Sequence, residues 1–98
     1  MARTIKWDEA ALSYLEKALE WIAEESVLQA ENVEQGILEK ITMITTAPER
    51  VPPDKFKKNN QGKYSAFETH SYRVAYTYTN EEVQILRVRH IKQNPKMY

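Results

Sequence analysis

The stretch SYRVAYTYTNEEVQILRVRH, residues 71–90, decides the fold that this sequence predicts. It contains two runs rich in Tyr, Val, Ile and Thr, which are typical of β-strands, separated by an acidic turn. Three arginines, Arg73, Arg87 and Arg89, interrupt these runs. Strand residues that only build a core do not need guanidinium groups, so the direction in which these side chains point matters.

The length of the turn determines which side chains share a face of this hairpin. A three-residue turn at 80–82 pairs Val74 with Val88 and Tyr76 with Leu86, and turns all three arginines to the opposite face. A two-residue turn would place two arginines among apolar side chains, where unpaired charge costs more than any turn preference. We therefore expect one face with Tyr72, Val74, Tyr76, Leu86 and Val88, and the other with Arg73, Ala75, Thr77, Ile85, Arg87 and Arg89.

In this register Arg73 lies directly opposite Arg89, an arrangement of like charges that is destabilising by itself. The repulsion favours an anionic partner, and small Ala75 and Thr77 predict a concave, uncovered face for it. A solvated sheet edge, or salt bridges to Glu68, would also explain the arginines.

Two helices are predicted before this hairpin. Residues 3–7 fit a short strand, Asp8 is a candidate N-cap, and Ser26 with Gln29 forms a capping-box pattern for a second helix. Gly36 interrupts the second helix and would be justified by close packing against the first. The first helix has an apolar stripe of Leu12, Leu15, Leu19 and Ile22 beside a second one of Tyr14, Ala18 and Trp21, and the second helix has Ala30, Val33, Ile37, Ile41 and Ile44.

The Pro-, Asn- and Lys-rich residues 47–63 form a loop, and YSAFET at 64–69 is a further strand. The predicted fold is α+β in the order β-α-α-β-β-β: a strand, an antiparallel helical hairpin, then a three-stranded antiparallel meander with the helices on one face. The 98 residues suit a single domain, 1–98.

Composition narrows the classes of function. There is no cysteine, no nucleophile or phosphate-loop motif, and no His spacing for a metal, so we expect neither metal nor cofactor. Without an apolar leader or membrane span, a cytoplasmic protein is expected. Residues 1–50 carry five basic and ten acidic residues, whereas residues 51–98 carry nine basic and four acidic ones. This split fits a basic surface for an anionic partner, or simply acidic helices preceding a lysine-bearing sheet.

Several segments carry a resemblance to a known family: ALEWIAEES, PPDKFKKNNQGKYSAFE, SYRVAY and ILRVRHIKQNPKMY. In this order, over nearly the whole chain, they resemble the RelE/ParE toxins of bacterial type II toxin–antitoxin, or plasmid stabilisation, modules. The resemblance implies growth inhibition either by metal-free endoribonuclease cleavage of mRNA on the ribosome, as in RelE-like members, or by poisoning of DNA gyrase, as in ParE-like members. It also implies neutralisation by a cognate antitoxin, encoded by the adjacent gene, that wraps the toxin.

The resemblance also suggests site residues. The arginine of the YRxxY strand, Arg73 here, would contact the scissile phosphate, or else form a structural salt bridge. His90 would transfer a proton, or pack at a strand end near the core. Tyr98 would stack on a base, donate a proton, or be a frayed end. Further phosphate contacts would come from Lys57, Lys58, Lys63, Arg87, Arg89 and Lys92.

One departure from the RelE pattern concerns the strand before YRxxY. RelE-like enzymes often carry basic residues there, whereas this chain has Ser65, Ala66 and Phe67. The nearby lysines of the loop could substitute from less fixed positions, and Asp54 lies about where some relatives have a catalytic glutamate. The sequence narrowly favours the ribonuclease, with gyrase inhibition or a degenerate, antitoxin-binding member as the alternatives.

Overall fold

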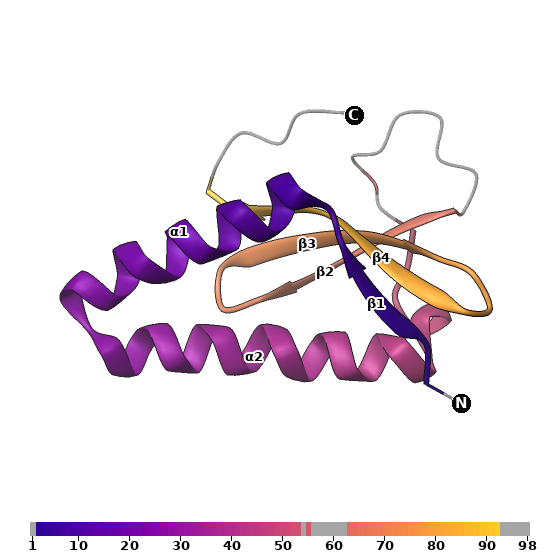
Figure 1. Cartoon of the computed structure of the whole chain (residues 1–98), viewed down its shortest axis with the longest axis horizontal. Helices are drawn as coiled ribbons and strands as arrows, with labels where there is room; N and C mark the ends of the chain where they lie inside the picture. Colours follow the sequence, from indigo (N-terminus) through magenta and orange to yellow (C-terminus); the bar gives the residue numbers. More distant parts are fainter. Residues whose placement is uncertain (1, 54, 56–62, 93–98) are drawn as a thin grey trace.

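The chain begins with a strand and a pair of helices and ends in a meander of strands, as predicted (Figure 1). The computed structural model describes residues 2–53, 55 and 63–92. Its elements are β1 (Thr4–Trp7), α1 (Glu9–Glu25), α2 (Val27–Thr46), a short 3-10 helix η1 (Pro48–Arg50), β2 (Tyr64–Thr69), β3 (Tyr72–Tyr78) and β4 (Glu82–His90). This order confirms the α+β class.

The four strands form one sheet in the order β1-β4-β3-β2. The pairs β2–β3 and β3–β4 are antiparallel, as expected for a meander, whereas β1 pairs in parallel with β4. The helical hairpin covers one face of the sheet, and the core lies between the two layers (Figure 1). Within the described residues, neither helix combines the length and the apolar character that a bilayer span requires.

Side-chain caps set the N-terminal ends of both helices. The Asp8 carboxylate accepts a hydrogen bond from the Ala10 N–H at 3.0 Å, which confirms Asp8 as the N-cap of α1. The Ser26 hydroxyl accepts from the Gln29 N–H at 3.1 Å, while the Ser26 N–H donates to the Ile22 carbonyl at 2.9 Å. Ser26 therefore closes α1 and opens α2, and because its own N–H is already used, only half of the predicted capping box forms.

The stripe predicted for α2 is confirmed, because Ala30, Val33, Ile37, Ile41 and Ile44 are all buried. The two stripes predicted for α1 are confirmed except at one residue in each. Leu15 and Ile22 are buried in the core, and Tyr14, Ala18 and Leu19 pack against it. Leu12 is 38% exposed and Trp21 is 65% exposed, so these two residues lie beside the face that contacts the core.

Gly36 packs against the β2–β3 turn and not against α1, so the expected reason for this glycine was wrong. A Cβ added at Gly36 would overlap the His70 ring and approach the Thr69 hydroxyl oxygen at 3.3 Å. His70 and Ser71 have φ values of 49° and 70°, left-handed at both central positions, as in a type I′ turn. The turn thus brings an imidazole onto the backbone of α2, where only glycine leaves room.

The register of the β3–β4 hairpin is as predicted near the arginines and different near the turn. Val74 pairs with Val88, but Tyr76 pairs with Ile85 and not with Leu86. Tyr78 pairs with Val83, so the connection is shorter by one residue than predicted, and a β-bulge at Leu86 restores the predicted pairing beyond it.

The bulge corrects two assignments of side chains to faces. Ile85 was expected on the arginine side but is fully buried in the core, together with Val83. Leu86, expected in the core, is only half-buried. A bulge allows the apolar residues near the turn and Val88 to face the same layer of helices, although no single period-2 register would do so.

Candidate functional site

The three arginines share the face of the sheet that is turned away from the helices, as predicted. Arg73 pairs with Arg89 on one side and with Glu68 on the other, and in the next row Ala75 lies between Ala66 and Arg87. Their neighbours along the strands, such as Val74 and Val88, belong to the core under the helices. We call the set Ala66, Glu68, Arg73, Ala75, Arg87 and Arg89 the arginine face.

The centre of the arginine face is less open than the sequence suggested. Arg73 is only 8% exposed and Arg89 only 7%, and Ala75 is also buried, so the expected uncovered concavity was wrong at these positions. An Arg73 Nη1 group donates to Glu68 Oε2 at 3.0 Å, which is the salt bridge considered as an alternative. Arg89 Nη1 donates to the His90 carbonyl at 3.4 Å. A carboxylate therefore compensates part of the charge in this row.

His90 lies on the other side of the sheet, under the helices. It pairs with Tyr72, and the two rings meet edge to face with centroids 5.2 Å apart. The His90 backbone N–H donates to the Tyr14 hydroxyl at 3.0 Å, and its Nδ1 accepts from the Lys92 N–H at 3.1 Å. In the neutral ring the proton is thus on Nε2. The sheet separates this imidazole from the arginine side chains, which matches the packing alternative for His90.

Of the other predicted site residues, the structure describes Lys63 and Lys92, and both lie at strand ends. Lys63 is exposed just before β2, where its carbonyl accepts from the Thr77 hydroxyl at 2.7 Å, and Lys92 is exposed just after β4. Lys57, Lys58 and Tyr98 lie outside the described residues, as does Asp54.

Strand β2 contributes one carboxylate, that of Glu68, to the arginine face. Ser65 and Phe67 pair with Tyr76 and Val74 and so share the core side, whereas Ala66 and Glu68 are directed to the arginines. The sequence analysis named Glu68 as a possible salt-bridge partner of the arginines, and the two-residue turn at 70–71 places Glu68 directly opposite Arg73.

Tyr72 and Tyr76 belong to the core and do not face the arginines. The Tyr76 hydroxyl, fully buried, donates to the Pro48 carbonyl at 2.7 Å and ties β3 to η1. Burial raises the pKa of Tyr76 to about 12, and burial, followed by the nearby Tyr14, also raises the pKa of Tyr72. Both hydroxyls thus stay protonated at neutral pH. The described residues include no group of His, Cys, Asp and Glu that could hold a metal ion.

Comparison with known proteins agrees with this architecture. No curated protein sequence matches the chain. Among solved structures, the chromosomal ParDE TA system from P. aeruginosa is similar with a TM-score of 0.68 and 15% identity, covering 93% of this chain and 98% of that one. An arginine-to-alanine double mutant of E. coli toxin RelE in the free state has a TM-score of 0.60 and 17% identity, covering 96% of this chain and 88% of that one. The family model of the ParE toxin of the type II toxin–antitoxin system parDE matches residues 5–95, and the chain therefore belongs to this toxin family.

Proposed function

We propose that this toxin of a type II toxin–antitoxin system inhibits DNA gyrase by binding it, without cleaving RNA. The match to the ParE family model and the likeness to a ParDE structure support this choice between the two activities of the wider family. A cognate antitoxin, encoded beside the toxin gene, would neutralise it by covering its surface.

The main observation that supports the proposal is that His90 and Arg73 lie on opposite faces of the sheet. Metal-free RNA cleavage requires a base for the 2′-hydroxyl, an acid for the leaving oxygen and cations for the phosphate, all around one phosphodiester. His90 packs on Tyr72 on the helix side of the sheet, and the other histidine of the chain, His70, lies against α2. Neither imidazole shares a face with Arg73.

The state of Arg73 supports the same proposal. Its guanidinium is engaged by Glu68, and the residue is nearly inaccessible to solvent. A phosphate would have to compete with this carboxylate, and Arg73 would have to become more accessible, before the guanidinium could stabilise charge that develops during cleavage. A non-enzymatic inhibitor needs a stable binding surface but no such rearrangement.

Cleavage of mRNA on the ribosome is the second candidate, because Arg73, Arg87 and Arg89 do lie together on one face. In that mechanism the proton-transfer groups would have to come from elsewhere than the two histidines. Glu68 is the titratable carboxylate nearest to Arg73 among the described residues.

Two assays on one toxin preparation separate the candidates. We expect near-stoichiometric toxin to block supercoiling of relaxed plasmid by gyrase, and to leave ribosome-bound mRNA intact in primer extension. Relief of growth arrest by the coexpressed antitoxin would show that the preparation is a functional toxin. Cut mRNA together with unaffected supercoiling would overturn the proposal.

A His90→Gln variant sharpens the comparison. Glutamine preserves a hydrogen-bonding side chain near the Lys92 N–H but cannot transfer protons as imidazole does. We expect this variant, once shown to be folded by circular dichroism, to inhibit gyrase as the wild type does. Toxicity lost in a folded His90→Gln protein would favour the ribonuclease.

A further inference from the structure

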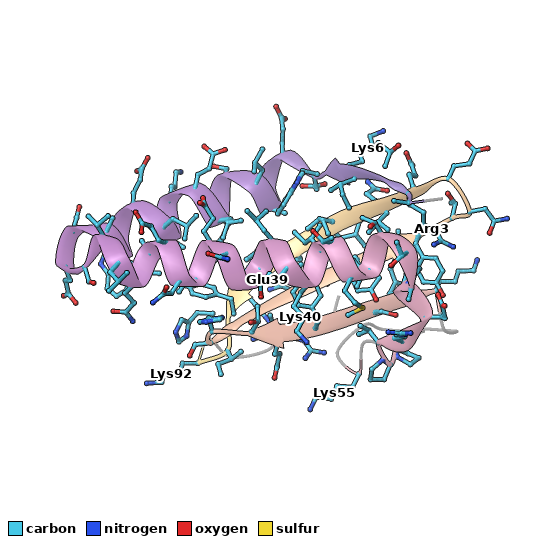
Figure 2. All side chains as sticks on the ribbon, turned by 90° about the horizontal axis from the view of Figure 1, so that it is seen from below. Arg3, Lys6, Glu39, Lys40, Lys55 and Lys92 are labelled. Atoms are coloured by element: carbon cyan, nitrogen blue, oxygen red, sulfur yellow. The ribbon has the colours of Figure 1, made fainter. Side chains whose placement is uncertain are left out.

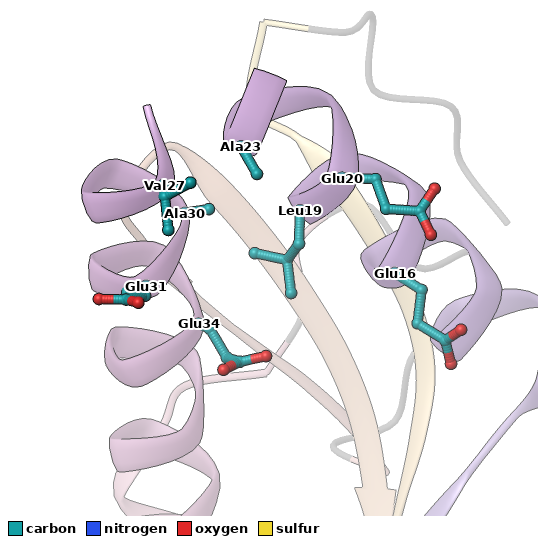
Figure 3. Close-up of a pocket in the computed structure, with 8 residues that line it drawn as sticks. All are labelled: Glu16, Leu19, Glu20, Ala23, Val27, Ala30, Glu31 and Glu34. Carbon is teal, nitrogen blue, oxygen red and sulfur yellow. The ribbon is translucent and has the colours of Figure 1, made fainter. Parts of the chain in front are cut away.

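A groove of about 370 Å³ lies between α1 and α2, near the closed end of the helical hairpin (Figure 3). Its floor is apolar and comes from both helices: Leu19, Ala23, Val27 and Ala30. Val27 is 62% exposed, and Trp21 and Leu28, on either side of the same interhelical turn, are 65% and 68% exposed. An exposed apolar floor between two helices is the kind of surface that marks interaction sites in soluble proteins, whereas Trp21 and Leu28 lie outside the groove lining.

Four glutamates flank this floor, two from each helix (Figure 3): Glu16, Glu20, Glu31 and Glu34. All four are exposed, and within the described residues their carboxylates make no ion pair. Glu16 and Glu20 are four residues apart on α1, and Glu31 and Glu34 three apart on α2, so each pair is mutually repulsive.

Within the part of the chain that the structure describes, no ion pair relieves this repulsion. Residues 9–46 contain eight glutamates and two lysines, Lys17 and Lys40. Neither lysine forms an ion pair with the four glutamates among the described side chains. Arg3 and Lys6 lie near β1, at the end of the molecule opposite the closed end of the hairpin (Figure 2).

We propose that this groove binds a basic amphipathic α-helix of a partner protein. The lining residues span 16–23 on α1 and 27–34 on α2, about 10 Å along each helix at 1.5 Å per residue. Two turns of a bound helix fit this length, with apolar side chains at i, i+3 or i+4 and i+7 on the floor. Lysine or arginine side chains beside that stripe meet the glutamates on both rims. This inference depends on the groove alone and is independent of the gyrase proposal.

The probe for this site is a synthetic 14-residue helical peptide with one leucine face and lysines elsewhere. Its control has glutamates in place of the lysines. Titrated into the full-length, isotope-labelled toxin, the basic peptide should shift the amide resonances of Leu19, Ala23, Val27 and Ala30. The acidic peptide should shift none of them. Shifts confined to other surfaces, or no binding at all, would overturn the proposal.

Paired variants distinguish the groove from general attraction to an acidic surface. Glu31→Gln/Glu34→Gln should weaken binding about fivefold, because exposed ion pairs contribute little individually. Glu24→Gln/Glu25→Gln makes the same change in net charge outside the groove lining and should weaken binding less than twofold. Equal weakening by both pairs would refute a defined site.

A second pair tests the apolar floor. Val27→Asp should weaken binding at least tenfold, since it places a charge on the floor of the groove. Leu28→Asp, at an equally exposed residue outside the lining, should leave the affinity within about twofold. Both positions are solvent-exposed, so the variants should fold. If the peptide did not bind the groove, the proposal that the toxin inhibits gyrase would still stand. If the toxin did not block supercoiling, the proposal that the groove binds a helix would still stand.

Discussion

Replacing Gly36 with alanine tests how the β2–β3 turn is fixed to α2. In an ordinary helix interior, Gly→Ala stabilises by about 1 kcal/mol, because alanine loses less backbone entropy. Here the new methyl group would overlap the His70 ring, so the imidazole must move away. The move also breaks the 2.9 Å hydrogen bond between the Thr69 hydroxyl and His70 Nδ1.

The two effects oppose each other with similar size. Loss of an exposed hydrogen bond and displacement of the ring from its rotamer cost about 1–2 kcal/mol together. We therefore expect Gly36→Ala to leave stability unchanged or lower it by roughly 1 kcal/mol in the wild-type background. In a His70→Gly background the obstacle is gone, and the same substitution should stabilise by about 1 kcal/mol.

Urea denaturation of the four proteins in this double-mutant cycle measures the coupling, expected at about 1–2 kcal/mol. In thermal melts, a change of 1 kcal/mol corresponds to roughly 4–8 °C for a domain of this size. Thr42→Ala, at an exposed position of α2, is the control and should have the same effect in both backgrounds. If Gly36→Ala stabilised both backgrounds equally, the contact between Gly36 and His70 would not be the reason for this glycine.

Three further substitutions test other features. Ser71→Gly should raise the unfolding free energy by about 1 kcal/mol, because φ is 70° at this residue, and an unchanged urea midpoint would contradict the left-handed turn. Tyr76→Phe should lower it by about 1–2 kcal/mol by leaving the buried Pro48 carbonyl without its donor. Since burial raises the pKa of Tyr76 from 10.0 to about 12, the wild type should lose stability as pH rises from 10 to 12, and the Phe variant should lose less. Glu68→Gln should destabilise the protein by about 1 kcal/mol, because it removes the charge that pairs with Arg73, whereas the control Glu81→Gln should not. Equal urea midpoints for the two variants would show that the salt bridge does not stabilise the fold.

Local signals in the sequence were sufficient for much of the fold. Asp8 and Ser26 cap helices where their side chains and spacing predict it, since N-cap hydrogen bonds involve neighbours only two or three residues away. The α2 stripe and the three C-terminal strands follow from periodicity. The prediction that Arg73, Arg87 and Arg89 share one face, which was based on the cost of burying unpaired charge among apolar side chains, is confirmed.

The errors arose where one local rule was extended over a whole element. A single register for β3–β4 could not satisfy both the tight turn and the arginines, and the chain resolves the conflict with a bulge at Leu86. The sequence carries a signal for it, because Val83 and Ile85 alternate in one phase and Val88 in the other. Such a phase change within a strand is what a bulge requires.

Other features depend on tertiary contacts that no local pattern contains. The partner of Gly36 is a turn more than thirty residues away, and strand alternation gives the face of Arg73 but not how far its side chain is buried. The candidate site shows the same limit. Strand alternation placed the arginines on one face and His90 on the side of Val88, but it left the role of His90 open between proton transfer and packing. The contacts of His90 with Tyr72 and Tyr14 match the packing alternative.

The parallel pairing of β1 with β4 joins the first of the described strands to the last. During translation, residues 4–7 leave the ribosome roughly 4–16 s before residues 82–85 at 5–20 residues per second. Until then β1 has no strand beside it, and the apolar sides of α1 and α2 lack the sheet that covers them. The native sheet can therefore assemble only after β4 has left the ribosome, and a partner that recognises the folded surface cannot bind before that point.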